Sequence, residues 1–356
     1  MTSTTPHNNG PFKALYLPPQ APSKALPSRP PHPLTPSQAL VKVHYSAVNP
    51  GDLRHFHMGM SGFVMGYDHV GTVITAPSSS ALSAKFPAGT PVFGMGVPFH
   101  QRPIHLGAHQ AYLLADLELA PHLTWKRPET LNPLDAVGMP NALLTAADGL
   151  VGWAAVQLAR AAGFEEILVT ARERNHGLLK EAGATRCFDY SKGAEAVVAE
   201  IRAVVRELEG KGMRLDAVFD AVGAGLGIWA GLDEETEKKV EGEFDKSTPA
   251  LAKRCLSDGV VEAGEAKLCC VLPVGKDQDY VFAIFTRRGE YAFGHPEWSE
   301  RQEKVVAWMI QNHKTAWRPW PKTRVVKDAD AAIEAVKDVY SGRVSQERVV
   351  IEHPML

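Results

Sequence analysis

Apolar and polar residues alternate along several short segments in the first part of the chain. The alternation is clearest in Ala39–Val48, which predicts a half-buried strand. Proline is so frequent in Pro18–Pro36 that this segment is predicted to be a loop or an edge ribbon rather than a helix. Short strands separated by glycine and proline indicate an all-β unit over roughly the first 130 residues. The other strands predicted in this unit are Lys13–Leu17, Val70–Ile74, Thr90–Phe93 and Ala111–Leu114.

The pattern changes after Pro133, where amphipathic helical segments separate short apolar runs. Strands that alternate with helices indicate βαβ units around a parallel sheet. The predicted helices are Trp153–Ala162, Asn175–Ala182 and Ala194–Leu208, and the predicted strands are Glu166–Thr170, Arg186–Phe188, Leu215–Phe219 and Leu268–Val274. Read by pattern alone, Ala142–Ala146 is a further strand, at the start of this series.

The last third of the chain adds a charged segment, two helices and a strand. Asp233–Lys246 is crowded with charged residues and is predicted to be a solvated excursion. A helix follows it, with Ser247 or Thr248 as the N-cap. Ala331–Tyr340 is predicted to be a helix and Arg348–Ile351 a final strand that returns to the β domain.

These patterns predict an α/β protein with two domains. Residues 1–11 are expected to be a flexible tail and residues 12–140 the β domain. Residues 141–295 are expected to form the parallel-sheet domain, and residues 296–356 a C-terminal segment that returns to the β domain.

Composition narrows the function of the chain by exclusion. The 356 residues carry a formal net charge of -2, so no basic excess is present to bind nucleic acid. No run approaches the 18 or so apolar residues of a membrane span, and the first ten residues lack the apolar core of a secretory signal. The four cysteines form no CxxC pair. A cytoplasmic protein with free thiols, and without a nucleic-acid or membrane partner, is expected.

Two arginines after a predicted strand are the best chemical signal from the residues themselves. In a dinucleotide-binding fold, the residue about 20 positions beyond the glycine loop selects the cofactor, and a cation there accommodates the 2′-phosphate of NADP. Counting from Gly152 leads to Arg172, with Arg174 close by. A guanidinium binds phosphate through two parallel hydrogen bonds. The alternative is a pair of solvated arginines in a loop.

The glycine loop itself is a weak signal. Gly149 and Gly152 bracket Leu150 and Val151 directly before the predicted helix Trp153–Ala162. Backbone amides at a helix N-terminus suit phosphate, but a GxxG pattern is common by chance.

A polar cluster follows the strand Ala39–Val48. It contains Asn49, Asp52, Arg54, His55 and His57, and it is either a site floor or a turn, because Asn-Pro-Gly-Asp is also a strong turn sequence. No cysteine precedes Pro140, so a cysteine-containing zinc site in this domain is excluded, and no metal is expected. His69 is expected to be a hydrogen-bonded core or turn histidine rather than a ligand.

Taken together, these segments resemble the medium-chain dehydrogenase/reductase superfamily, and within it the zinc-free quinone oxidoreductases and the trans-acting enoyl reductases of fungal polyketide pathways. The resemblance extends over nearly the whole chain from Lys13. It implies a GroES-like β domain, a Rossmann-type parallel-sheet domain and a cleft between them. The segments that carry it are ALVKVHYSAVNPGDLRH, MGYDHVGTV, FPAGTPVFGM, GAHQAYLLAD, ALLTAADGL, VGWAAVQLARAAGF, LKEAGATRCFDYS, LDAVFDAVG and GRVSQERVV.

The resemblance also implies roles for individual residues. Thr145, Asn49 and Arg54 are the expected catalytic residues, because they match the segments beside nicotinamide and substrate; His55 and Tyr67 are weaker candidates for the acid that donates a proton. NADPH is the expected cofactor. The residues expected to bind it are Asp52, Gly149, Val151, Gly152, Arg172, Arg174, Asn175, Tyr190, Val222, Gly223, Val344 and Ser345.

One departure from the family pattern concerns the junction of Leu150 and Val151. In the family, ALLTAADGL is a helix, followed by a linker, a strand and the glycine loop; here these are absent, so the first Rossmann strand is missing or replaced. Because a central parallel strand pairs on both edges, its loss is expected to leave a gap in the sheet.

The expected function is an NADPH-dependent, zinc-independent reductase. It would transfer hydride to an activated C=C bond of an enoyl or enone group, or to a quinone. The substrate would be a small molecule or a carrier-bound acyl group, and a polyketide synthase is an implied partner. The alternative is a non-catalytic or cofactor-impaired relative that acts as a binding or accessory protein.

Overall fold

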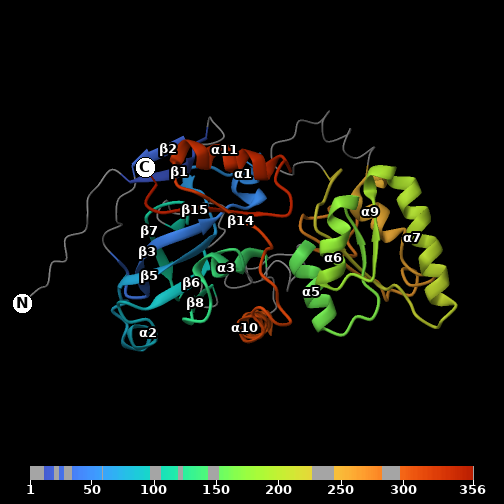
Figure 1. Ribbon diagram of the computed structural model, residues 1–356, viewed down its shortest axis with the longest axis horizontal. Helices are drawn as coiled ribbons and strands as arrows, with labels where there is room; N and C mark the ends of the chain where they lie inside the picture. Colours follow the sequence, from blue (N-terminus) through green and yellow to red (C-terminus); the bar gives the residue numbers. More distant parts are fainter. Residues whose placement is uncertain are drawn as a thin grey trace, which may run out of the picture. The chain divides into compact units, whose positions relative to one another are not determined.

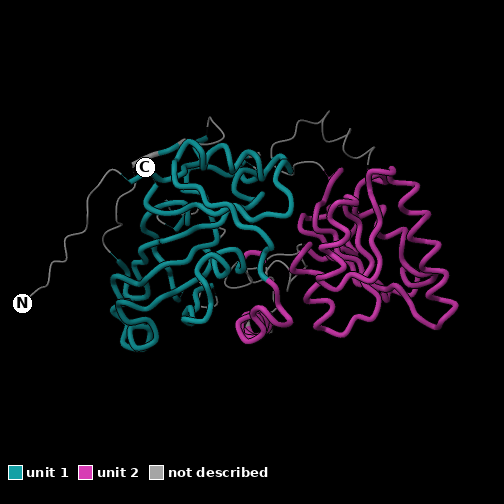
Figure 2. Tube along the Cα trace, in the orientation of Figure 1, with its two compact units in different colours: residues 1–140, 288–296, 319–356 teal, residues 141–287, 297–318 magenta. Residues whose placement is uncertain are grey.

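The computed structural model describes residues 12–19, 24–27, 34–57, 59–96, 106–118, 123–142, 152–226, 244–282 and 297–355. The chain divides into two compact units, which Figure 2 shows in teal and magenta. Unit 1 comprises residues 1–140, 288–296 and 319–356, and unit 2 comprises residues 141–287 and 297–318. Each unit is described by itself below.

Unit 1 is built on a mostly antiparallel sheet whose centre is the predicted strand after Pro36. Its strand order is β14 (Thr323–Val326), β15 (Arg348–Glu352), β3 (Gln38–Ala47), β5 (Asp68–Thr75), β6 (Pro91–Met95) and β8 (Thr124–Lys126), and β7 (Tyr112–Asp116) also pairs with β3. A smaller sheet has the order β2 (Lys24–Pro27), β1 (Lys13–Leu17) and β4 (Phe63–Val64). The predicted strands of this region are confirmed, but helices α1 (Pro50–His57) and α2 (Ser80–Lys85) interrupt them, so the unit is not all-β. Strand β2 makes part of the proline-rich segment the predicted edge ribbon.

Residues 319–356 return to this unit, whereas residues 297–318, which the sequence analysis placed in the same C-terminal segment, belong to unit 2. Strand β15 pairs antiparallel with β3, so that Ile351 lies opposite Ser46. Helix α11 (Ala329–Tyr340) precedes β15, and the Asp328 side chain caps its first turn. The apolar face of α11, including Ala332 and Val336, is buried in a core with residues of β1 and β15. Figure 1 shows α11 beside β1, β2 and α1 (Pro50–His57).

Unit 2 contains parallel strands and the helices that cover them, which confirms the predicted βαβ class. The strands are β9 (Leu168–Thr170), β10 (Arg186–Phe188), β11 (Ala217–Asp220), β12 (Lys267–Cys270) and β13 (Tyr280–Phe282). The helices are α5 (Gly152–Ala161), α6 (His176–Ala182), α7 (Ala194–Glu209), α9 (Thr248–Lys253) and α10 (Glu297–Gln311) (Figure 1). The side chain of Ser247 accepts a hydrogen bond from the amide of Ala250, so Ser247 is the cap of α9.

The parallel strands of unit 2 form two separate sheets. Strand β9 pairs with β10, whereas β11 pairs with β12 and β12 with β13. Among the described residues, no strand pairs with the remaining edge of β9 or of β11. Leu168 and Val169 of β9, and Ala217–Phe219 of β11, are only half-buried, which is unusual for the middle of a parallel sheet. The predicted gap in the sheet is therefore confirmed within the described residues.

The structure also differs from the sequence prediction in several places. The Asn-Pro-Gly-Asp segment, predicted as a turn or a site floor, begins helix α1 instead. The strand predicted over Ala142–Ala146 is wrong at its first residue, because residues 140–142 are helical. The rest of that predicted strand, Leu143–Ala146, lies outside the described residues. The predicted tail 1–11 and most of the charged excursion, residues 233–243, also lie outside them. Elements that the sequence pattern did not reveal are α2 (Ser80–Lys85), α3 (Pro133–Val137), α10, β8, β13 and β14.

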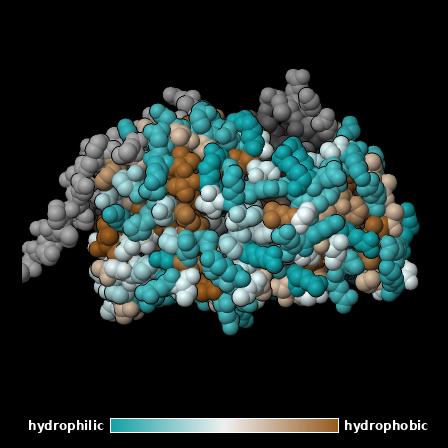
Figure 3. Space-filling model, viewed as in Figure 1, coloured by the Kyte–Doolittle hydropathy of each residue, from teal (hydrophilic) through white to brown (hydrophobic). Residues whose placement is uncertain are grey.

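The surface is mostly polar on the face drawn in Figure 3, where apolar residues lie in separate patches. Across the described ranges, no helix combines the length and apolar character that crossing a bilayer requires. The large apolar side chains that are most exposed are Phe164, Tyr190, Val222 and Val281, all of them in unit 2.

Candidate functional site

The polar cluster predicted after β3 is present in unit 1, and its centre is the carboxylate of Asp52. This carboxylate accepts hydrogen bonds from the amides of Asn49, at 2.7 Å, and Gly66, at 3.1 Å. The Nε2 atom of His109 lies 3.2 Å from it. Burial alone raises the pKa of Asp52, but the charge and hydrogen bond of His109, with the Asn49 amide, outweigh burial and hold this pKa below its ordinary value. Asp52 thus holds the start of α1 in place.

Asn49 belongs to a second part of the same buried network. Its Oδ1 atom accepts a hydrogen bond from Nη2 of Arg348 at 2.9 Å, and its Nδ2 atom donates to Oδ2 of Asp68 at 3.0 Å. Asn49 is 3% exposed, and both ends of its amide are engaged by other side chains. The structure therefore places Asn49 and Asp52 together, as predicted, but points their polar atoms into the protein.

The other face of α1 is more open and carries Arg54 and His55, which are both half-buried. The hydroxyl of Tyr67, from the segment before β5, lies 2.7 Å from Nε2 of His55. The two rings meet edge to face, with centroids 5.4 Å apart. Arg54 and His55 are thus half-buried polar groups of α1, and the hydroxyl of the buried Tyr67 lies against His55. His57 lies on the last turn of α1.

A short hydrogen-bonded chain leads from Asp52 to the C-terminal strand. Ser46 Oγ lies 2.8 Å from Nδ1 of His109 and 2.7 Å from Nε2 of His353. His353 is buried, and burial, together with the nearby His109 and His44, keeps its pKa well below the ordinary value. This series of hydrogen bonds therefore connects β3, the segment before β7 and the residue after β15, and all of its side chains are buried.

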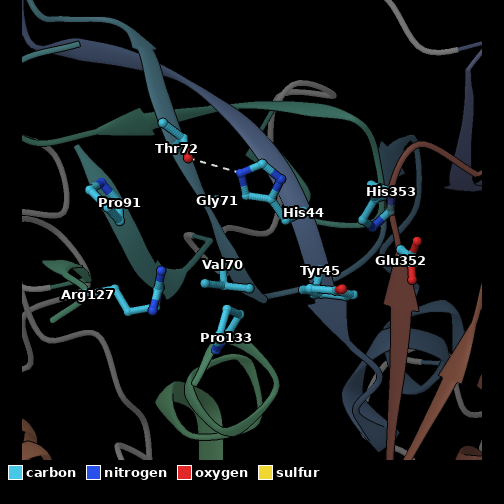
Figure 4. Close-up of a pocket in the computed structure, with 10 residues that line it drawn as sticks. All are labelled: His44, Tyr45, Val70, Gly71, Thr72, Pro91, Arg127, Pro133, Glu352 and His353. Atoms are coloured by element: carbon cyan, nitrogen blue, oxygen red, sulfur yellow. Dashed lines mark hydrogen bonds between the residues drawn. The ribbon is translucent and has the colours of Figure 1, made fainter. Parts of the chain in front are cut away.

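A half-open cavity of about 280 Å³ lies on the sheet of unit 1 (Figure 4). The ring of His44 faces Thr72 across it, with Nε2 and Oγ1 3.0 Å apart. Burial, followed by the charges of Lys42 and Arg127, lowers the pKa of His44. None of the residues predicted to bind cofactor or substrate lines this cavity. Its lining residues are His44, Tyr45, Val70, Gly71, Thr72, Pro91, Arg127, Pro133, Glu352 and His353.

His69 is a buried core residue of β5, not a turn residue. It is 1% exposed, and neither ring nitrogen makes a hydrogen bond of normal geometry within the described residues, so the expectation of a hydrogen-bonded histidine is wrong. Burial lowers the pKa of His69 to about 4, and a weak contact with the backbone of Tyr67 opposes this only in part. In the part of the chain that the structure describes, no group of three or more His, Cys, Asp or Glu side chains is arranged to hold a metal ion.

In unit 2, the predicted cofactor residues follow the carboxyl ends of the parallel strands. Arg172 and Arg174 are exposed; Arg172 precedes the 3-10 turn Glu173–Asn175 that follows β9, and Arg174 lies within this turn. Tyr190, after β10, is 50% exposed, and Val222, after β11, is 58% exposed. Because the carboxyl ends of parallel strands share one edge of a sheet, ligands of such folds bind there. Two cations and an aromatic ring therefore follow the carboxyl ends of β9 and β10, and an apolar side chain follows the carboxyl end of β11 in the other sheet.

The turn after β11 requires glycine. Asp220 Oδ1 accepts hydrogen bonds from the amides of Val222 and Gly223, at 2.8 and 3.1 Å. Gly223 has a φ of 63°, and a Cβ on it would come within 2.7 Å of Leu272. Both facts require glycine at this position. The turn is therefore fixed by the Asp220 carboxylate and packed against Leu272.

The remaining predicted residues are placed only in part. Gly152 begins α5, and the indole of Trp153 donates a hydrogen bond to the carbonyl of Arg318 at 3.0 Å. Val344 and Ser345 are half-buried in the loop between α11 and β15, in unit 1. Thr145, Gly149 and Val151 lie outside the described residues. The structure thus shows the start of α5, but not the loop predicted to bind the pyrophosphate.

The fold combines a GroES-like β unit with a Rossmann-like parallel-sheet unit. A model described as alcohol dehydrogenase GroES-like domain matches residues 35–116, and one described as zinc-binding dehydrogenase matches residues 151–233. The chain belongs to the medium-chain dehydrogenase/reductase superfamily.

Two curated relatives show how far the sequence similarity extends. The zinc-binding alcohol dehydrogenase domain-containing protein cipB of Emericella nidulans is 33% identical over 183 residues, which cover 49% of this chain and 54% of that protein. The trans-enoyl reductase gkaC of Penicillium citrinum is 26% identical over 181 residues, which cover 43% of this chain and 50% of that protein. The chain spans about half the length of the curated relatives it matches.

Solved structures resemble the chain over almost its full length. The quinone oxidoreductase from Coxiella burnetii is 20% identical with a TM-score of 0.57, covering 96% of this chain and 99% of that chain. A mycobacterial protein solved in complex with NADPH is 19% identical with a TM-score of 0.62, with the same coverage. At these identities the similarity establishes the fold.

The residues that sequence reasoning missed are the buried partners of Asn49 and Asp52, namely Ser46, Asp68, His109, Arg348 and His353. They come from distant parts of the chain and follow no periodic pattern. The signal that could have found two of them is charge: Asp68 and Arg348 are ionised side chains within strands that otherwise read as core, and a buried charge needs a partner.

Proposed function

We propose that this protein is an NADPH-dependent, zinc-independent reductase that transfers hydride to an activated C=C bond of an enoyl or enone group, or to a quinone. The observation that carries the proposal is the pair of exposed cations Arg172 and Arg174 after β9, with Tyr190 exposed after the neighbouring strand β10. A guanidinium pair matches the dianionic 2′-phosphate of NADPH, and the phenol ring offers a surface on which an adenine can stack.

The residues of unit 2 suit the adenosine half of this cofactor, with Asn175 beside the arginines and Val222 exposed in the turn after β11. Gly149, Val151 and Gly152 would bind the pyrophosphate, and Asp52, Val344 and Ser345 the nicotinamide half. When bound, the nicotinamide supplies the hydride. The chain's own residues must then bind the substrate carbonyl and stabilise the negative charge that develops on its oxygen.

Arg54 is the described residue best suited to that task, because its guanidinium is a permanent cation on the open face of α1. We propose that Thr145 donates a second hydrogen bond to the same oxygen. Asn49 was predicted to share this role, but its amide is buried and bonded to Arg348 and Asp68. Asn49 is therefore better suited to fixing the start of α1, the helix that carries Arg54. Zinc is not needed if these donors stabilise the enolate.

Carrier-bound acyl chains are the proposed substrate class, and a polyketide synthase the proposed partner. The relatives named trans-enoyl reductases support this choice. The four cysteines are free thiols, which fits the proposed cytoplasmic location.

A second candidate function is a cofactor-impaired relative that binds a substrate or a partner without turnover. The gap between β9 and β11 favours it, because a parallel sheet without its central strand lacks the usual support for the phosphate loop. Sequencing the transcript across the Leu150–Val151 junction tests whether further residues restore that strand.

Titration of the protein with NADPH, followed by nicotinamide fluorescence, separates the two functions. Saturable binding, followed by NADPH oxidation on addition of a trans-2-enoyl thioester or a quinone, is expected for the reductase. No binding at millimolar NADPH would establish the second function. Repeating the assay after treatment with a chelator, with metal content measured by mass spectrometry, tests zinc independence: activity should be unchanged, and a loss restored by zinc would refute it.

A further inference from the structure

The hydroxyl of Tyr67 is a buried acid beside a half-buried histidine. Tyr67 is only 4% exposed, and its hydroxyl lies 2.7 Å from Nε2 and 3.0 Å from Nδ1 of His55, which is half-buried. A neutral imidazole can take up a proton at one nitrogen and release one at the other. The pair is therefore a path by which a proton from solvent can reach the phenol.

The backbone on both sides of Tyr67 is held rigidly. The amide of Gly66 donates to Asp52, and the next residue, Asp68, is bound by Arg348 and Asn49. The carbonyl of Tyr67 itself accepts a hydrogen bond from the amide of Gly96 at 2.8 Å. Catalytic groups need this precision, because a small displacement of a proton donor costs much of its rate advantage. The buried network thus gives the phenol a fixed position.

The first turn of α1 leaves room beside the pair. Gly51 has no side chain, and a Cβ there would lie 3.8 Å from Tyr67 Cε2 and 3.9 Å from His55 Cε1, so any larger side chain would cover both rings. Arg54, the proposed donor to the substrate carbonyl, lies on the same helix next to His55. The cation that a reductase of activated double bonds requires is therefore carried by the helix whose His55 contacts the acid.

We propose that Tyr67 is the acid that protonates the α-carbon of the substrate, and that His55 returns the proton to it. This proposal rests on the proposed reductase function. Hydride from NADPH forms the C–H bond at the β-carbon, and the π electrons move onto the carbonyl oxygen to give an enolate. The enolate α-carbon then takes the phenol proton, which leaves a phenolate. His55 gives its N–H proton to the phenolate, and the half-buried imidazole is then reprotonated by water.

The test uses the full chain, NADPH and a trans-2-enoyl thioester in D₂O, with the α-deuterium located by NMR. The wild type should place deuterium on one face of the α-carbon. Tyr67→Phe should lower kcat by about 10²- to 10⁴-fold, which is the usual contribution of a general acid, and the residual product should carry deuterium on both faces. NADPH binding should be unchanged, because the phenol is not proposed to touch the adenosine half.

His55→Gln keeps a polar group beside Tyr67 but cannot relay a proton in the same way, so it should lower kcat less while preserving the single-face deuteration. Tyr112→Phe, a buried tyrosine of β7, is the matched control and should behave as the wild type. An unchanged NADPH titration and circular dichroism spectrum identify folded variants.

The outcomes separate this proposal from the function on which it rests. If none of the tested acceptors supports NADPH oxidation by the wild type, the proposed reductase function is refuted, and the role of Tyr67 as its acid is refuted as well. If the wild type is active but Tyr67→Phe keeps both its rate and its single-face deuteration, only the role of Tyr67 is overturned. If Tyr67→Phe does not fold, His55→Gln provides the test. A rate and a dependence of the rate on D₂O equal to those of the wild type would then refute the proton relay.

Discussion

Arg348 on β15 and Asp68 on β5 form a buried ion pair, with 2.6 Å between Nη2 and Oδ2. The Asp68 side chain is fully buried and that of Arg348 is 10% exposed. The pair joins residues 280 positions apart in the sequence, so it locks the C-terminal strand onto the N-terminal part of unit 1. Through Asn49 it also fixes the helix that carries Arg54 and His55.

Removing one partner of this pair should destabilise unit 1 strongly. Asp68→Asn leaves a buried guanidinium without its counter-charge, which typically costs about 3–5 kcal/mol. The apparent free energy of unfolding in urea, followed by circular dichroism, measures the loss. The double variant Asp68→Asn, Arg348→Met should recover part of it. Arg343→Gln, which breaks an exposed pair with Asp338, is the control and should cost no more than about 1 kcal/mol. Equal losses for the buried and exposed pairs would contradict this account.

Replacing both Arg172 and Arg174 by Ala should weaken NADPH binding without affecting NADH. Hydrogen bonds to charged groups contribute about 1.5–3 kcal/mol, which corresponds to roughly a 10- to 100-fold increase in the Kd for NADPH. Fluorescence titrations with both cofactors provide the measurement. Arg186→Ala removes a cation elsewhere in the same unit, where it pairs with Glu207, and should change neither affinity. A parallel loss of NADH binding would mean that the arginines do not recognise the 2′-phosphate.

Stability should fall as the pH is lowered from 6.5 toward 4. Burial lowers the pKa of His69 to about 4 from its ordinary 6.5, so the unfolded chain takes up a proton throughout this range and the folded chain does not. The unfolded state binds more protons, and the linkage relation then makes the free energy of unfolding rise with pH. His44 and His353, whose pKa values are also lowered, act in the same direction.

Thermal unfolding between pH 4 and 7 measures this effect. His69→Asn removes one titrating group and should flatten the dependence of Tm on pH in this window. His313→Asn, in the segment after α10, is the comparison and should leave the slope as in the wild type. If His69→Asn has the wild-type slope, the buried imidazole is not a source of the acid sensitivity.

The two open strand edges of unit 2 should be visible in hydrogen exchange. Strand β12 is paired on both sides, whereas β9 and β11 each have one edge that no described residue pairs. Amides that point away from the paired neighbour lack protection, so part of Leu168–Thr170 and Ala217–Asp220 should exchange faster than Leu268–Cys270. Uniformly slow exchange in all three strands would mean that another segment fills the gap.

The features that the sequence predicted well depend on neighbouring residues. Strand β3 follows from strict alternation, because one face of a half-buried strand must be apolar. Helix α6 ends at Gly183, whose φ of 120° few other residues adopt, and α9 starts at the Ser247 cap. The interrupted sheet was also predictable, because a missing strand leaves both of its neighbours with an unpaired edge. In contrast, α1 begins with a sequence that by itself favours a turn, and it is held as a helix start by Asp52 and its partners.

The sequence by itself determined the class of fold, the positions of many of the strands and helices, and the placement of Arg172, Arg174 and Tyr190 after parallel strands, since each of these depends on local pattern and chain order. Only the tertiary structure decided that Asn49 and Asp52 point inward and that Tyr67 meets His55. Those outcomes depend on side chains such as His109 and Arg348, which no local pattern connects to α1. A buried charge or amide must find its partner wherever the folded backbone places one, so such contacts are fixed by packing rather than by spacing along the chain.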